Sequence, residues 1–99
     1  MTRPLVFEDF ANRVGDDFTI DDQGLGGIAL RLTEAEPLRA TWSKPGHRPP
    51  FSLIFVGKHP QVLEQRLYPF DLAGIGKVDI FLVPIGKDEN GVSYQALFN

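Results

Sequence analysis

The sequence contains no cysteine, and this absence excludes several classes of protein at once. Without cysteine the chain has no disulfide scaffold, no thiol catalysis and no Cys-ligated zinc. No apolar run approaches the roughly 18 residues that a membrane-spanning helix needs. The first residues also lack the apolar stretch of about 7–15 residues found in a signal peptide. We therefore expect synthesis in the cytoplasm and no membrane insertion, and the final location stays open.

Basic residues are scarce as well. The chain carries 10 Lys and Arg against 13 Asp and Glu, for a net charge of −3. Nucleic-acid binding depends on Lys and Arg that neutralise phosphates, so we expect no nucleic-acid partner. At 99 residues with 42% hydrophobic content, the chain is long enough for one folded domain, residues 1–99, and too short for two.

Helical periodicity is confined to the N-terminal part of the chain. Phe7, Phe10, Ala11 and Val14 are spaced to fall on one face of a helix. Gly15 follows at the position of a left-handed C-cap. This pattern predicts one short helix over residues 5–14.

After Gly15 the hydrophobic period changes to two, which is typical of strands. The Asn90-Gly91 pair favours a hairpin with a type I′ turn. Strands are predicted over residues 17–21, 27–34, 50–57, 62–70, 78–85 and 92–98. Within residues 62–70, Leu63 and Leu67 are expected on one face.

Parallel strands need long crossover connections, which are usually helical. The sequence predicts no second helix, so it favours antiparallel strands. The fold class is therefore all-β with one short N-terminal helix. We expect a small six-stranded antiparallel barrel or a compact sandwich, with the helix plugging one end or covering one face.

No arrangement of residues in the sequence is typical of catalysis. Ser52 lacks the Gly-x-Ser-x-Gly context of a hydrolase nucleophile. The acids Asp16, Asp17, Asp21 and Asp22 lack the alternation of a calcium loop, and we interpret them as a solvated surface. We expect no enzyme activity, no cofactor and no metal.

Several basic side chains flank the strongest predicted strand, residues 50–57. If the two flanking loops meet, these side chains form a weak anion-binding patch. Its candidate members are Lys44, His47, Arg48, Lys58 and His59.

Two predicted strands, 50–57 and 78–85, are apolar on both faces, whereas a small barrel buries only its inner face. Either the N-terminal helix covers the outer face through Phe7, Phe10 and Val14, or part of it stays exposed as an apolar patch, which is typical of protein interfaces. The candidate interface residues are Trp42, Ile54, Val56, Phe81 and Val83, with another protein or a second copy as partner.

An alternative function is a small-molecule-binding barrel. Its pocket would be lined by the aromatic residues Phe51, Phe55, Tyr68 and Tyr94. Against it, a barrel of this size usually fills its interior with side chains.

Sequence motifs along the chain resemble a family of short uncharacterised bacterial proteins that end in a Tyr-Glu-Ala-Val-Phe-Asn-like tail. The motifs are Pro50-Phe51-Ser52-Leu53-Ile54-Phe55, Leu63-Glu64-Gln65-x-x-Tyr68, Ile80-Phe81-Leu82-Val83-Pro84-Ile85-Gly86, Tyr94-Gln95-Ala96-Leu97-Phe98-Asn99 and the N-terminal Phe10, Val14-Gly15 and Phe18. Gln95 stands where the family carries Glu. The resemblance implies no catalytic residues. It implies a structural or assembly role beside phage-tail-like proteins.

Overall fold

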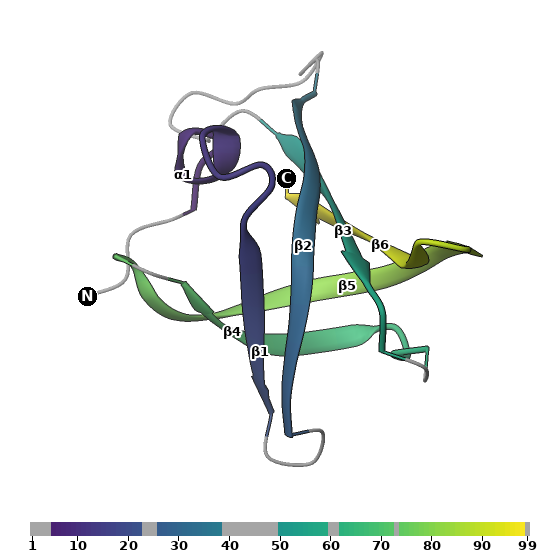
Figure 1. Ribbon diagram of the computed structural model, residues 1–99. Coiled ribbons are helices and arrows are strands. Elements are labelled where there is room, and N and C mark those ends of the chain that lie inside the picture. Colours follow the sequence, from purple (N-terminus) through teal and green to yellow (C-terminus); the bar gives the residue numbers. More distant parts are fainter. Residues whose placement is uncertain (1–4, 23–25, 39–49, 60–61, 73, 99) are drawn as a thin grey trace.

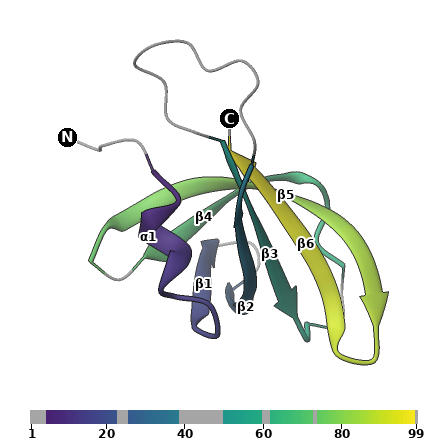
Figure 2. The same cartoon turned by 90° about the horizontal axis from the view of Figure 1, so that it is seen from above.

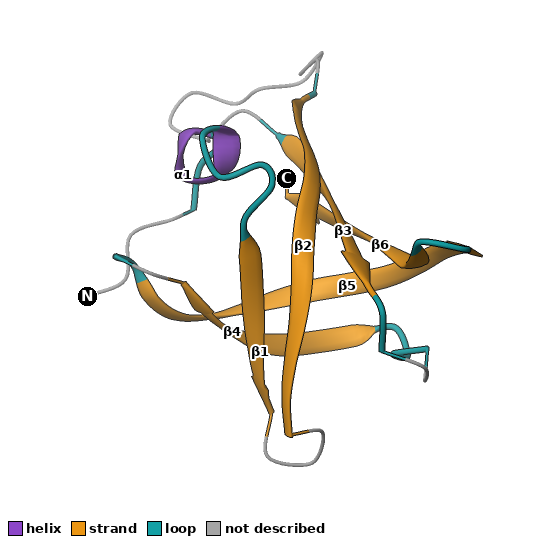
Figure 3. Ribbon diagram, viewed as in Figure 1, coloured by secondary structure: helices purple, strands orange, loops and turns teal. Residues whose placement is uncertain are grey.

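The computed structural model describes residues 5–22, 26–38, 50–59, 62–72 and 74–98. Within these residues the chain forms one short helix and six strands (Figure 1, Figure 3). In chain order the elements are α1 (Glu8–Ala11), β1 (Asp17–Asp22), β2 (Gly26–Pro37), β3 (Phe51–Gly57), β4 (Arg66–Leu72), β5 (Gly76–Asp88) and β6 (Gly91–Phe98).

The strands close into a barrel in the order β1-β2-β3-β6-β5-β4 (Figure 2). Every neighbouring pair is antiparallel. The barrel closes where β1 meets β4, through the pairs Thr19–Asp71 and Ile20–Phe70. The predicted six-stranded antiparallel barrel is confirmed, and the sandwich alternative is wrong because this last pairing joins the two edges.

The interior of the barrel is filled by side chains from alternate positions of each strand. Phe51 and Phe98 stack with their ring centroids 4.5 Å apart. Phe55 contacts Phe18 on one side and Phe70 on the other, at 5.6 and 5.4 Å. Such ring pairs add about 0.5–1.5 kcal/mol each beyond the area they bury.

Helix α1 closes the end of the barrel where β1 and β3 begin and β6 ends (Figure 1). Phe10 is fully buried, and its ring lies 6.1 Å from Phe18, 5.9 Å from Phe51 and 5.9 Å from Phe98. Of the two predicted positions for the helix, the structure therefore has the plug.

The helix is shorter than the predicted 5–14, and that prediction is wrong at both ends. Val14, expected on the buried face, is 48% exposed. The reason is pairing with β2. The backbone N–H of Gly15 donates to the carbonyl of Leu32 at 2.7 Å, and the N–H of Leu32 donates to the backbone carbonyl of Asp16 at 3.0 Å. This pairing takes the chain away from helical geometry before Val14 reaches the core.

Strand β4 begins at Arg66, four residues later than predicted. Leu63 therefore lies outside the strand and is 3% exposed, whereas Leu67 is 54% exposed. The expectation that these two leucines share a face is wrong, because the strand alternation starts only after Leu63.

Two register shifts carry strands past their predicted ends. One lies between Leu32 and Glu34 in β2, and the other lies between Pro84 and Gly86 in β5. In β5 the shift leaves Ile85 between the paired residues Pro84 and Gly86, and the strand continues past its predicted end at residue 85 to Asp88.

The hairpin between β5 and β6 is present, but its predicted type I′ turn is wrong. That turn needs positive φ at both central residues, and no described non-glycine residue has positive φ. Asp88 pairs with Gly91, and only Gly91 turns to positive φ, at 128°.

Candidate functional site

Apolar side chains gather on the outer surface of four neighbouring strands, β3, β6, β5 and β4. Leu67, Ile85 and Leu97 are 54, 52 and 53% exposed, and Phe81 is 44% exposed. The others are half-buried. The outer apolar face comprises Ile54, Val56, Leu67, Phe81, Val83, Ile85 and Leu97.

The strand register makes this face continuous. Gln95 on β6 pairs with Ile54 on β3 and with Val83 on β5, which forms one row across three strands. Leu67 pairs with Phe81 across β4 and β5. Because directly opposed side chains lie about 4.5–5.5 Å apart, these residues touch or nearly touch their neighbours.

The polar side chain in the middle of the face is held in place. The amide Nε2 of Gln95 donates a hydrogen bond of 3.1 Å to Oγ of Ser52, which is 7% exposed. A bonded amide presents less unsatisfied polarity to an arriving partner. The row through Gln95 is therefore compatible with a desolvated interface.

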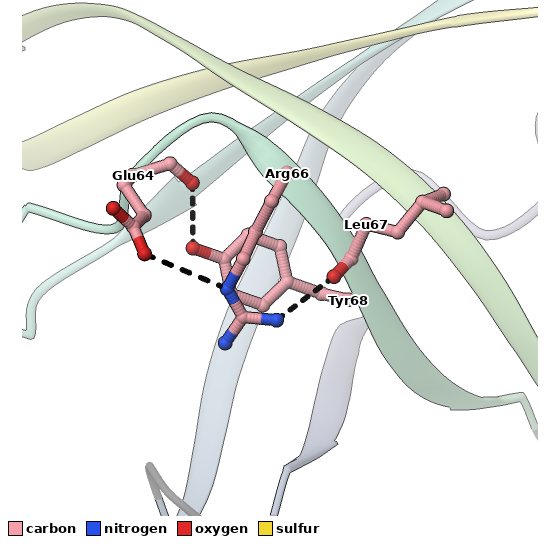
Figure 4. A network of polar contacts seen from close by, with 4 residues as sticks. All are labelled: Glu64, Arg66, Leu67 and Tyr68. Atoms are coloured by element: carbon pink, nitrogen blue, oxygen red, sulfur yellow. Dashed lines mark hydrogen bonds and ion pairs between the residues drawn. The ribbon is translucent and has the colours of Figure 1, made fainter.

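A small polar network fixes the start of β4 beside Leu67 (Figure 4). The Arg66 guanidinium lies 4.1 Å from the centroid of the Tyr68 ring, and its Nη1 donates a hydrogen bond to the carbonyl of Leu67 at 3.0 Å. The Tyr68 hydroxyl donates to the carbonyl of Glu64 at 2.6 Å. Leu67 itself extends away from the Tyr68 ring (Figure 4), and it is 54% exposed.

A half-open groove of about 520 Å³ adjoins the face at Val56. Its lining residues come from β1, β2, the end of β3 and the turn between β5 and β6. The lining residues are Asp17, Ala29, Arg31, Thr33, Val56, Lys58 and Asn90. Arg31 pairs with Asp17 at 3.2 Å, and both side chains are more than half exposed.

Comparison with known proteins gives the family. The family model described as "Domain of unknown function (DUF6916)" matches residues 5–98, nearly the whole chain. The chain belongs to this family. No curated protein and no solved structure matches the chain. The expectation that the chain belongs to a family of unknown function is thereby confirmed.

In this DUF6916 domain, four of the predicted interface residues lie on the outer apolar face. Ile54, Val56 and Val83 are half-buried there, and Phe81 is well exposed. Trp42, the remaining candidate, lies outside the described residues.

Three members of the face were not predicted from the sequence. Leu97 alternates with the buried Ala96, so the period of two contains its signal. Leu67 was assigned to the same face as Leu63, and that assignment depended on a strand beginning too early. Ile85 is exposed beside the bulge in β5, for which the sequence carries no clear signal.

The aromatic residues proposed for a ligand pocket belong to the DUF6916 core. Phe51, Phe55, Tyr68 and Tyr94 are each at most 1% exposed. Their rings pack against other core side chains, so they offer no surface to a ligand in this arrangement.

The predicted anion patch is described only in part. Lys58 is exposed and lines the groove, and His59 is half-buried. Lys44, His47 and Arg48 lie outside the described residues.

Two of the acids on β1 form ion pairs. Asp17 pairs with Arg31, and Asp21 pairs with Lys77 at 2.9 Å. Over the described ranges, no group of three or more His, Asp or Glu side chains is placed to hold a metal ion. No helix in the described part of the chain has the length and apolar character to cross a membrane.

Proposed function

We propose that this protein is a non-catalytic interaction domain that binds another protein through the outer apolar face. The observation that supports the proposal is the exposure of Leu67, Phe81, Ile85 and Leu97 on adjoining strands. Isolated exposed apolar residues are common, but a continuous rimmed patch marks an interaction site.

Leaving this apolar surface in water costs free energy. Each Å² of apolar surface removed from water contributes about 25 cal/mol, so four half-exposed large side chains provide a substantial driving force. Helix α1 packs on the rings at the barrel end, and the exposure of the face shows that no described residue covers it. A partner protein is the natural cover.

The resemblance noted in the sequence suggests the setting. We propose a bacterial phage-tail-like assembly, in which the domain acts as an accessory and the partner is a structural component. A self-associating domain that uses the same face is the competing outcome.

The test begins with capture of partners from source cells by the tagged protein, followed by purification of each identified partner. The dissociation constant is then measured for the native protein, for Phe81→Ser with Leu97→Ser, and for Val14→Ser. Val14 is similarly exposed but lies outside the face. We expect the double variant to weaken binding at least about tenfold, as truncation of central apolar contacts does.

Two results would contradict the proposal. One is undiminished binding by the double variant, and the other is an equal loss in Val14→Ser. Sedimentation of the same variants distinguishes self-association, because a dimer through this face dissociates only in the double variant.

A further inference from the structure

The groove beside the outer apolar face has an unusual charge for this protein. The whole chain has a net charge of −3. Among the described residues that line the groove, Arg31 and Lys58 are cations and Asp17 is a carboxylate. The two cations offer an anion positive charge and hydrogen-bond donors.

The fold brings these groups together from distant parts of the chain. Arg31 on β2 pairs with Val56 on β3, and Lys58 follows β3 directly. The turn that holds Asn90 reaches them because Gly91 lies against the backbone of Gly57. The groove lining consequently combines hydrogen-bonding groups with the apolar side chains of Ala29 and Val56.

Donors remain available in the groove. Arg31 uses its Nε in the exposed pair with Asp17, which leaves the other guanidinium N–H groups. Within the described part of the chain, the Lys58 ammonium has no hydrogen bond or ion pair. A planar guanidinium with a nearby amide suits a carboxylate, which accepts two parallel hydrogen bonds.

We propose that this groove is a carboxylate-binding subsite that receives an Asp or Glu side chain of the protein docked on the outer apolar face. In naming that source, the inference rests on the proposed function. Val56 belongs to both the face and the groove, so a partner seated on the face has direct access. The described lining residues carry one net positive charge, which matches a carboxylate better than a dianionic phosphate. The apolar side chains of Ala29 and Val56 suit the methylene stem.

The subsite can be tested without the partner. Acetyl-glutamate amide, its neutral glutamine analogue and inorganic phosphate are titrated into the labelled protein, and backbone amide shifts are followed. We expect acetyl-glutamate amide to shift Thr33, Lys58 and Asn90 saturably, and the glutamine analogue to shift them little. Phosphate is expected to bind more weakly than the glutamate derivative.

Variants then assign the binding to the groove. Arg31→Gln and Lys58→Gln should each weaken it up to about fivefold, as single exposed charge pairs do. Asp17→Asn should tighten it, because it removes the carboxylate that competes for Arg31. Lys77→Gln makes the same charge change outside the groove lining and should leave binding unchanged. All four positions are exposed, so the folded state should survive each change.

Equal shifts with the glutamine analogue, tighter binding of phosphate, or an equal loss in Lys77→Gln would overturn the subsite. The partner experiment separates the two proposals. Loss of partner binding in the Phe81 and Leu97 variant but not in Arg31→Gln or Lys58→Gln removes the subsite and leaves the proposed function. Glutamate binding in the groove with unchanged partner binding by the Phe81 and Leu97 variant removes the proposed function and, with it, the partner as source of the carboxylate.

Discussion

The hydroxyl of Tyr94 accepts a hydrogen bond of 2.9 Å from the backbone N–H of Leu63 inside the barrel. Tyr94 lies on β6 and is 1% exposed, whereas Leu63 precedes β4. The bond therefore connects the segment that leads into β4 with β6, and the two bonded residues lie 31 positions apart in the chain. A buried N–H needs such a partner, because an unsatisfied one costs free energy.

Tyr94→Phe should therefore lower the free energy of unfolding by about 1–3 kcal/mol, the cost of leaving a buried donor unpaired. Tyr68→Phe is the matched control. It removes a bond to the carbonyl of Glu64 that is only partly buried, so its loss should be smaller. Urea denaturation measures both. An equal effect of the two changes would show that the Leu63 bond has no special role.

The plug formed by α1 depends on Phe10. Phe10→Ala should lower the free energy of unfolding by about 3–5 kcal/mol, because the cavity lies between Phe18, Phe51 and Phe98. Val14→Ala, four residues further on at a 48% exposed position, should change it by less than about 0.5 kcal/mol. Thermal and urea unfolding provide the comparison. A stability change below about 1 kcal/mol for Phe10→Ala would mean that α1 is not part of the cooperative core.

The pair between Lys77 and Asp21 gives a pH dependence with a definite sign. The hydrogen bond from Lys77 to Asp21, and then the charge attraction to the same carboxylate, raise the pKa of Lys77 above 10.5, with a further contribution from Asp71. A raised pKa in the folded state means that the stabilisation is fully present below 10.5 and disappears as pH rises through the raised value.

Lys77→Gln should accordingly be less stable than the native protein below pH 10.5, and this difference should shrink as pH rises above that value. The Lys77 side chain is 71% exposed, so added salt should also reduce the difference. Melting temperatures over a pH series measure the effect. Lys87→Gln is the control for general charge. A difference that grows with rising pH would contradict the assigned cause.

Alternation in the sequence was sufficient to predict the strand faces where strands are regular. Phe51, Leu53 and Phe55 are buried while Ile54 and Val56 face outward, as the period of two predicts. Errors arise where long-range pairing overrides local pattern. The contact of Gly15 with Leu32 ends the helix early, and the bulge at Pro84 extends β5.

The candidate site was likewise predictable only in part. The outward orientation of Phe81 and Val83 follows from local alternation with Ile80 and Leu82. The groove could not be predicted, because it needs the approach of the β5–β6 turn to the end of β3, and that approach is a property of the closed barrel.

The approach of the β5–β6 turn to β3 depends on Gly91. Gly91 has a φ of 128°, and a Cβ built there would meet the carbonyl oxygen of Gly57. Gly91→Ala therefore incurs both backbone strain and a clash with backbone atoms, so we expect a loss of at least about 1–3 kcal/mol. Gly27→Ala is the control, since its Cβ would meet nothing within 4 Å and its φ is ordinary; this change should be neutral or stabilise by up to about 1 kcal/mol. Because Asn90 lines the groove, Gly91→Ala should also weaken glutamate binding there, whereas Gly27→Ala should not. Retention of native stability by Gly91→Ala would show that the β5–β6 turn is not held against β3.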